Sequence, residues 1–149
     1  MKLEIALLVK RVQTNLKKYL ARSKASEMSF DSFITFLPTP DLEKTTHFYE
    51  HVLKLPLELD QTTCRIYRIA QGGFIGFCAK TEIKIQEGVI LTLVTENADE
   101  WEQIFTEHHL PIETPPTFNS DYQIYQMFVR DPNGYLIEIQ RFEDPRWTS

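Results

Sequence analysis

The hydrophobic positions that follow residue 30 form one pattern that occurs twice along the chain. The run 32–38 is rich in β-branched and aromatic residues, which favours a strand, and residues 42–53 then carry apolar side chains at helical spacing. The run 88–94 is again typical of a strand, and the segment that begins at Asn97 repeats the helical spacing. The pattern therefore predicts a strand followed by a helix in each half of the chain.

Local signals predict where both helices begin and end. Thr39 is a candidate N-cap with Pro40 at the first helical position, and Asn97 is the expected start of the second helix. Each helix is followed by nearly the same string, Leu-Pro-Leu-Glu at 55–58 and Leu-Pro-Ile-Glu at 110–113. The repeated string indicates two copies of one structural unit.

Two further strands are predicted in each half. The runs 63–70 and 74–79 meet at a pair of glycines, whereas the runs 122–130 and 135–142 are joined by Asp-Pro-Asn-Gly, in which Gly134 can adopt the positive φ of a tight turn. Each half therefore reads β-α-β-β-β. Neither half can bury its sheet face well alone, so the two are expected to pair.

The two modules, at 31–79 and 88–142, are expected to form one domain that spans 28–149. The predicted fold class is α+β, with a curved mixed sheet around a cleft. Residues 1–27 are expected to add an N-terminal helix and a linker, because apolar side chains recur at helical spacing over 3–22 with basic residues between them. We expect this helix to pack on its own domain or on a partner subunit rather than on a membrane surface.

Composition and charge narrow the class of partner. The 149 residues are 42% hydrophobic, and no apolar run approaches the ~20 residues that a membrane span requires. Residues 1–27 contain seven Lys and Arg and two Glu, a charge of +5. The net charge of the whole chain is −5, so residues 28–149 have a charge of −10. Such an acidic body disfavours nucleic acid and favours a cationic ligand. A cytoplasmic protein is expected.

The cysteines and the helical histidines match no motif of a metal site or a nucleophile. Cys64 and Cys78 have neither CxxC nor zinc-site spacing, so they are expected to be small buried thiols rather than a disulfide scaffold. His47 and His51 stand four residues apart on the first helix, a spacing that can bind a metal, but they are expected to face solvent.

The last predicted strand contains a carboxylate among apolar residues. Period-2 alternation puts four of its residues on one face: Leu136, Glu138, Gln140 and Phe142. Glu138 is then either the sole charge in a lined cavity or a carboxylate that pairs with Arg65 or Arg68 across the sheet. In a cavity it would hold a cation, hydrogen-bond a ligand or act as a general base.

Two segments resemble the vicinal oxygen chelate superfamily, which includes glyoxalase I, extradiol dioxygenases and the fosfomycin- and bleomycin-resistance proteins. They are TPDLEKTTHFYEHVLKLPLE at 39–58 and FVRDPNGYLIEIQ at 128–140, and the paired modules extend the resemblance over 31–142. The resemblance implies that Glu138 points into the concave face of the sheet, where metal-dependent members use a carboxylate as a ligand. It does not fix the activity, because the superfamily contains lyases, dioxygenases, transferases and non-catalytic binders.

The other ligand positions that the resemblance implies have no donor side chain. They fall on Ile34 in the first strand, Val89 in the fifth strand and Gly76 as the first-module counterpart of Glu138. A divalent metal needs several N or O ligands that converge on one point, so no metal or other cofactor is expected, and Glu138 would be a ligand only if a metal were present. The cleft residues expected to contact a ligand are Glu138, Ile34, Phe36, Phe74, Gly76, Val89, Leu136 and Gln140.

Three functional hypotheses of different classes follow. The first is a metal-independent protein resembling the bleomycin-resistance branch, which sequesters a small molecule in an aromatic-rich cleft. Its aromatic candidates are Phe33, Phe36, Tyr67, Phe74, Phe77, Tyr125 and Phe128. The alternative is a metal-dependent lyase or dioxygenase of the glyoxalase type with displaced ligands, and the third is a structural or regulatory module with a collapsed cleft. A homodimer is expected, because members of the family often dimerise and residues 5–20 carry an apolar stripe.

Overall fold

The computed structural model describes residues 30–85 and 87–147. The chain divides after Asp31, and every helix and strand described below belongs to the unit Ser32–Ser149. The N-terminal helix and linker predicted for residues 1–27 lie outside the described residues. Among the helices that the structure describes, none is long and apolar enough to cross a membrane.

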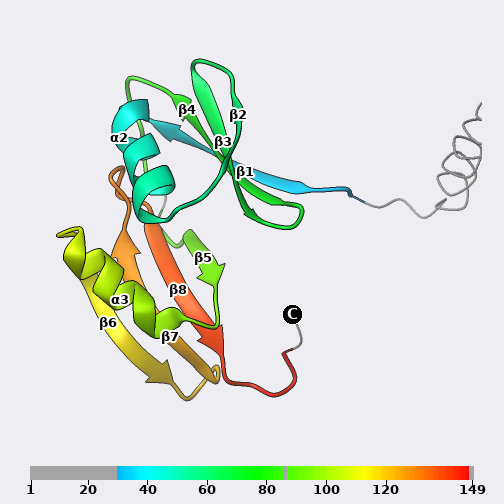
Figure 1. Cartoon of the computed structure of the whole chain (residues 1–149), viewed down its shortest axis with the longest axis vertical. Coiled ribbons are helices and arrows are strands. Elements are labelled where there is room, and N and C mark those ends of the chain that lie inside the picture. Colours follow the sequence, from blue (N-terminus) through cyan, green and yellow to red (C-terminus); the bar gives the residue numbers. More distant parts are fainter. Residues whose placement is uncertain (1–29, 86, 148–149) are drawn as a thin grey trace, which may run out of the picture. The chain divides into compact units, whose positions relative to one another are not determined.

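The first module is a four-stranded mixed sheet with a helical segment on one face. Its elements are β1 (Phe33–Thr39), α2 (Leu42–Thr46), the π-helical turn η1 (His47–Val52), β2 (Leu57–Asp60), β3 (Cys64–Ala70) and β4 (Gly73–Ala79). The strand order is β1-β4-β3-β2, in which β1 is parallel to β4 and the other neighbours are antiparallel. Figure 1 shows α2 beside this sheet, with the module coloured from blue to green.

The second module repeats this order. Its elements are β5 (Ile90–Val94), α3 (Ala98–Glu107), β6 (Ile112–Asn119), β7 (Ile124–Arg130) and β8 (Leu136–Phe142). The strand order is β5-β8-β7-β6, again with one parallel pair, β5 with β8. The α+β class and the paired β-α-β-β-β modules are therefore confirmed, and the strands hydrogen-bond into two four-stranded sheets rather than one continuous sheet.

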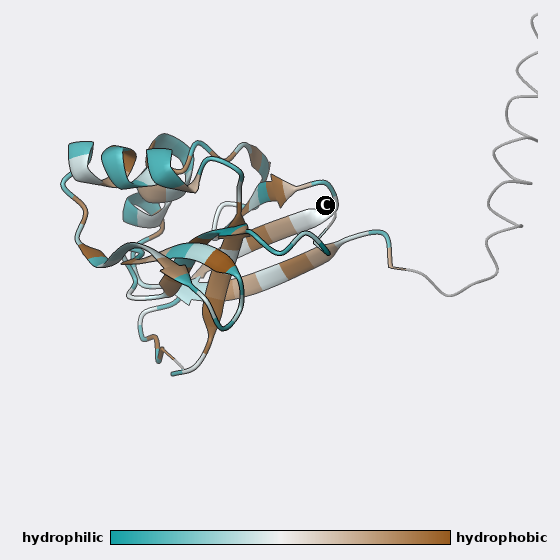
Figure 2. Cartoon of the chain, turned by 90° about the horizontal axis from the view of Figure 1, so that it is seen from below, coloured by the Kyte–Doolittle hydropathy of each residue, from teal (hydrophilic) through white to brown (hydrophobic). Residues whose placement is uncertain are grey.

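Each sheet buries one of its two faces beneath its own helix. In the first module, Tyr67 and Phe77 lie in the buried core with Tyr49 of η1, and the rings of Tyr49 and Phe77 are 4.4 Å apart. In the second module, Ile137 and Ile139 of β8 belong to the same core as the helix α3, whose buried residues include Phe105. Figure 2 shows hydrophobic residues recurring along the strands, whereas the helices are largely hydrophilic on the side seen. Burial of each large apolar side chain contributes about 1.5–3 kcal/mol.

The first helix begins two residues later than the sequence predicts. Asp41 is the N-cap, because its side chain accepts a hydrogen bond from the amide of Lys44 at 2.9 Å. Thr39 is fully buried instead, and its hydroxyl bonds to Thr45 and Asn133 at 2.8 Å each. The predicted start of the second helix is confirmed, since Asn97 is the N-cap of α3.

The repeated Leu-Pro string follows the same backbone feature in both modules. Lys54 and His109, which directly precede the string, have positive φ values of 56° and 54°. The amides of the leucines that follow donate to helix carbonyls at 2.9 Å in each module. A left-handed residue therefore ends each helix, although neither residue is the glycine that such ends favour.

Cys64 and Cys78 form a disulfide between β3 and β4. The antiparallel register places these residues, 14 apart in sequence, directly opposite each other with their Cα atoms 4.0 Å apart. The prediction of two free buried thiols is therefore wrong, because motif spacing does not reveal which residues a strand register brings together.

Hydrogen bonds from the turn Asp131–Tyr135 join the second module to the first. We call this turn and its partners in the first module the inter-module latch; the partners are Pro38, Thr39, Thr45 and Tyr49. The carboxylate of Asp131 accepts from the Tyr49 hydroxyl at 3.1 Å and from the Tyr135 amide at 2.9 Å. The Tyr135 hydroxyl donates to the carbonyl of Pro38 at 2.8 Å. The latch thus binds the start of β8 to the β1–α2 connection and to η1.

Burial affects both ionisable partners at the centre of the latch. Desolvation raises the pKa of the Asp131 carboxyl, while hydrogen bonds from Asn133, Tyr135 and Tyr49 oppose that shift. Burial and the neighbouring Asp131 carboxylate raise the pKa of Tyr49 well above its ordinary value. Tyr49 therefore stays protonated and can donate its hydrogen bond at any physiological pH.

We predict that Tyr49→Phe lowers the free energy of unfolding by about 1–3 kcal/mol, because the buried Asp131 carboxylate loses a donor. Urea unfolding monitored by circular dichroism measures the change. Tyr122→Phe is the matched control, since Tyr122 is 72% exposed and its loss should fall within about 0.5 kcal/mol. Equal effects of the two substitutions would contradict the role given to the latch.

We also predict that a chain lacking residues 1–27 keeps both modules folded, because every helix and strand of the two sheets follows Asp31. The far-ultraviolet circular dichroism of residues 28–149 and their cooperative urea unfolding are the measurements. An unfolded truncated chain would show that the N-terminal segment is part of the core.

Candidate functional site

The predicted cleft residues fall on two sheet faces, each of which is the face opposite its helix and is called here a helix-free face. The helix-free face of the first sheet carries Ile34, Phe36, Phe74 and Gly76. The helix-free face of the second sheet carries Leu136, Glu138 and Gln140. Among the described residues, no hydrogen bond links the side chains on one helix-free face to those on the other.

Val89 belongs to neither helix-free face. The strand β5 begins at Ile90, which pairs with Leu136 as Ile34 pairs with Phe74 in the first module. Ile90 is therefore the counterpart of Ile34, and Val89 lies one residue before the equivalent position. Val89 instead borders a separate hollow, whose other lining residues are Leu37, Pro38, Lys84 and Tyr135.

The aromatic candidates divide between the two faces of each sheet. Phe36, Phe74 and Phe128 lie on helix-free faces, as their registers require. Tyr67 and Phe77 lie in the core. Tyr125 lies on the helix side of the second sheet, where the Arg141 guanidinium covers its ring. These rings therefore do not all line one cleft.

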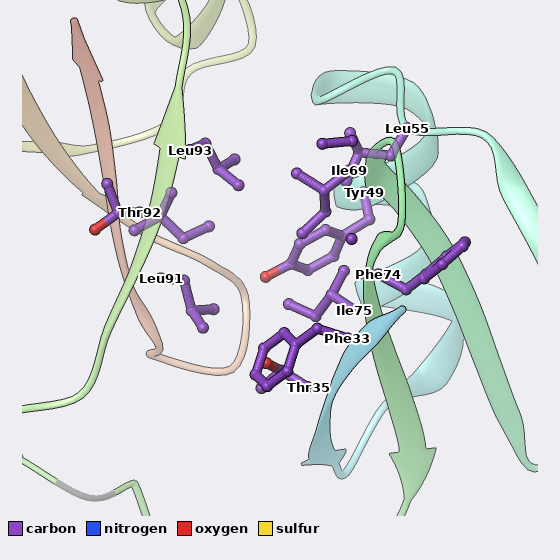
Figure 3. A pocket seen from close by; sticks show the side chains of 13 residues that line it. Phe33, Thr35, Tyr49, Leu55, Ile69, Phe74, Ile75, Leu91, Thr92 and Leu93 are labelled. Carbon is purple, nitrogen blue, oxygen red and sulfur yellow. The ribbon is translucent and has the colours of Figure 1, made fainter. Parts of the chain in front are cut away.

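An apolar hollow of about 210 Å³ lies between the two modules (Figure 3). Its lining residues are Phe33, Thr35, Tyr49, Leu55, Ile69, Ala70, Gly73, Phe74, Ile75, Leu91, Thr92, Leu93 and Ile137. Figure 3 shows Leu91 and Leu93 on one side and Tyr49, Ile75 and Phe33 on the other. Glu138 does not line this hollow, so the hollow offers apolar volume without an ionised group among its walls.

The ring of Phe36 occupies the space where a side chain at position 76 would extend. Phe36 pairs with Gly76 across β1 and β4, and a Cβ added to Gly76 would lie 2.5 Å from the Phe36 ring and 3.5 Å from Ile66. The first module therefore replaces a polar side chain at this position with an aromatic ring laid over glycine.

The corresponding pair in the second module is Thr92 and Glu138. Thr92 pairs with Glu138 across β5 and β8, and its hydroxyl donates to Glu138 Oε2 at 2.7 Å. Glu138 is only 8% exposed, and no described residue donates a hydrogen bond to Oε1. Sequence reasoning missed Thr92, although the spacing between Asn97 and Asp41, the two N-caps, aligns it with Phe36.

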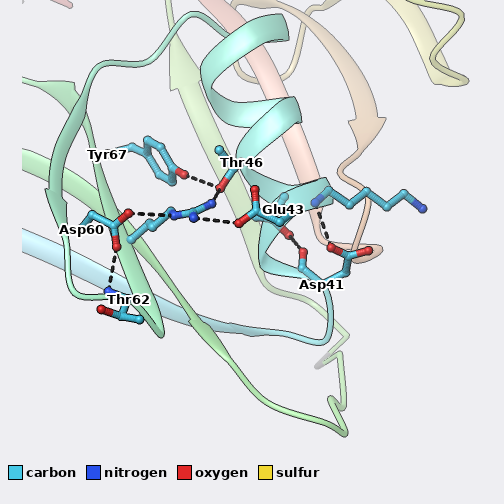
Figure 4. A network of polar contacts seen from close by, with 9 residues as sticks. Asp41, Glu43, Thr46, Asp60, Thr62 and Tyr67 are labelled. Atoms are coloured by element: carbon cyan, nitrogen blue, oxygen red, sulfur yellow. Dashed lines mark hydrogen bonds and ion pairs between the residues drawn. The ribbon is translucent and has the colours of Figure 1, made fainter.

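The arginines proposed as partners of Glu138 are engaged elsewhere. The guanidinium of Arg65 donates to Glu43 at 2.7 Å and to Asp60 at 3.2 Å, which ties α2 to the edge of the first sheet (Figure 4). Arg68 pairs with Glu58. Within residues 30–85 and 87–147, Glu138 makes no ion pair, so the interpretation as an internal salt bridge is wrong.

The residues at the ligand positions that the sequence resemblance implies do not fit a divalent metal. Ile34, Ile90 and Gly76 offer no side-chain donor, and the described residues contain no cluster of three His, Cys, Asp or Glu side chains that could hold a metal ion. His47 and His51 are exposed on the first helix, as predicted, with their rings 5.2 Å apart.

Comparison with known proteins agrees with this fold. The family described as "Glyoxalase/Bleomycin resistance protein/Dioxygenase superfamily" matches residues 31–139. No curated protein matches the chain.

Solved structures share the fold at low identity. An integron cassette protein from the mobile metagenome of the Halifax Harbour sewage outfall is 17% identical, with a TM-score of 0.65 over 74% of this chain and 97% of that chain. Lactoylglutathione lyase from Agrobacterium tumefaciens is 16% identical, with a TM-score of 0.64 over 82% of this chain and 100% of that chain. A possible glyoxalase from Bacillus cereus is 18% identical, with a TM-score of 0.62 over 74% of this chain and 98% of that chain.

These likenesses show the fold alone, whereas the family match covers most of the chain and both β-α-β-β-β modules. The resemblance found in the sequence is thereby confirmed: the chain belongs to the glyoxalase/bleomycin resistance protein/dioxygenase superfamily.

Proposed function

We propose that the protein binds a small molecule without a metal, at the helix-free face of the second sheet, with Glu138 as the charged acceptor. The observation that carries this proposal is the state of the carboxylate. Thr92 holds one oxygen, no described residue donates to the other, and no described cation neutralises the charge. A carboxylate this deeply placed is stabilised by additional donors, which a ligand supplies.

Binding is favoured over the alternative of a metal-dependent lyase or dioxygenase of the glyoxalase type. That alternative needs ligands at positions that hold Ile34, Ile90 and Gly76, and the Phe36 ring fills the space beside the last of these. No second ionisable group among the described residues hydrogen-bonds to Glu138, so the face has no hydrogen-bonded acid and base pair. A role in sequestration, as in resistance proteins of the family, follows from binding without chemistry.

We also propose that the protein is a homodimer in the cytoplasm. Phe33 and Phe36 of β1 are 72% and 52% exposed, and β1 and β5 each have one edge that pairs with no described strand. A second copy would cover these exposed rings and pair these edges.

The assembly is tested by light scattering of the full chain during size exclusion, at micromolar concentration. The expected mass is twice the 17.5 kDa of one chain. A mass of one chain across that concentration range would contradict the dimer.

The binding proposal is tested with a ligand found by thermal-shift screening in the presence of EDTA. Glu138→Gln keeps the shape of the side chain but removes its charge, so affinity should fall about 10- to 100-fold, the equivalent of about 1.5–3 kcal/mol for a charge-assisted hydrogen bond. Isothermal titration calorimetry measures the loss. The free energy of unfolding should change by less than about 1 kcal/mol.

Glu100→Gln is the matched control, because Glu100 is exposed on α3 and its substitution removes the same charge. It should leave affinity unchanged. Equal affinities for the wild type and Glu138→Gln would contradict the proposal, as would a screen in which ligands bind only after a divalent metal is added.

A further inference from the structure

Two glutamine side chains lie beside Glu138 on the same face of the second sheet. Gln140 follows Glu138 by two residues on β8, and the register pairs Gln140 with Gln126 of β7. The corresponding residues of the first module are Cys64 and Cys78, which pair across β3 and β4 and bond to each other. The second module thus has a pair of amides where the first has a closed disulfide.

The Gln140 side chain makes no hydrogen bond with a described residue, although the residue is only 6% exposed. An amide has two donor hydrogens and one acceptor oxygen, all of which can form hydrogen bonds with a ligand. No side-chain N or O atom of the described residues is both sealed from solvent and unpartnered. The Gln140 amide and Glu138 Oε1 therefore still reach solvent, and both can bond a ligand that enters there.

The neighbouring strands define the sides of this polar row. Thr92 flanks Glu138 on β5 and uses its hydroxyl on Oε2, which leaves Oε1 as the free acceptor. Phe128 flanks Glu138 on β7, directly opposite it in the register, and its ring is partly exposed. An aromatic ring beside a carboxylate favours a planar cation, because the carboxylate binds the N–H groups while the ring contacts the cation face.

We propose that the ligand has an amidinium or guanidinium group at one end and a neutral carboxamide or similar amide at the other, joined by a flat apolar body. This inference rests on the proposed function. Glu138 binds the cation, the Gln140 and Gln126 amides bind the carboxamide as reciprocal donors and acceptors, and the body lies against Phe128. Two residues along a strand separate the binding groups by about 6–7 Å, which sets the spacing in the ligand.

Three probes of one shape separate the two binding points. 4-Amidinobenzamide has the cation and the carboxamide at opposite ends of a ring, benzamidine has the cation alone, and terephthalamide has carboxamides at both ends. Each is titrated calorimetrically into the full-length protein in EDTA. We expect 4-amidinobenzamide to bind about 5- to 10-fold more tightly than benzamidine, the gain of about one neutral hydrogen bond.

Substitutions on the protein should separate the same two points. Glu138→Gln should weaken 4-amidinobenzamide and benzamidine about 10- to 100-fold and leave terephthalamide nearly unchanged. Gln140→Leu should weaken 4-amidinobenzamide about 5- to 10-fold and leave benzamidine unchanged. Gln126→Leu, at a less buried position, repeats this test if Gln140→Leu does not fold. The matched controls are Glu100→Gln and Gln103→Leu on α3, which should change no affinity.

The outcomes distinguish this inference from the proposed function. Equal binding of benzamidine and 4-amidinobenzamide, or glutamine substitutions that weaken both to the same extent, would overturn the assignment of the amide pair. If none of the probes binds but a ligand from the screen is weakened by Glu138→Gln, the ligand class is wrong and the proposed function stands. If Glu138→Gln weakens no ligand of any kind, both are wrong.

Discussion

The arrangement of the two modules depends on the hydrogen bonds that the buried carboxylate of Asp131 accepts. It accepts a hydrogen bond from the hydroxyl of Tyr49 in the first module. It also accepts hydrogen bonds from backbone and side-chain donors of its own turn. A buried carboxylate needs these hydrogen-bond donors. If the turn separated from η1, the carboxylate would lose the donor of Tyr49 or become exposed to water, and both changes cost free energy. Because β8 starts one residue after Tyr135, the same turn also fixes where the strand of Glu138 begins.

The two modules use equivalent positions for opposite purposes. In the first, glycine at position 76 leaves space that the Phe36 ring fills, and the result is an apolar surface. In the second, the small Thr92 leaves room for Glu138 and supplies a hydroxyl to it. One module therefore has an apolar helix-free face, and the other has a row of polar side chains on the corresponding face.

Signals confined to a few neighbouring residues predicted much of this fold. Period-2 alternation predicted that Glu138 lies on one face of its strand and Ile137 and Ile139 on the other, and the repeat predicted both modules. The helical spacing that begins at Asn97 located α3. The family itself was recognisable from the segments around the first helix and the last strand, because both combine turn residues and apolar residues at fixed spacing.

Features that depend on partners far along the chain were not predictable in this way. Thr39 looks like an N-cap, but its hydroxyl bonds to Asn133, 94 residues later, and Asp41 caps the helix instead. The Cys64–Cys78 disulfide depends on strand register, which motif spacing does not report. The sequence analysis assigned a ligand position of the fifth strand to Val89, one residue before the equivalent residue Ile90. A shift of one residue moves a side chain to the opposite face of a strand.

We propose that Glu138 binds its ligand directly and not through a metal. Calorimetric titration of Zn²⁺, Mn²⁺, Ni²⁺ and Fe²⁺ into protein that has been treated with EDTA tests this, in parallel for the wild type and Glu138→Gln. We expect no metal to bind stoichiometrically to the wild type in a way that Glu138→Gln abolishes. One metal bound per chain in the wild type and none in Glu138→Gln would contradict it.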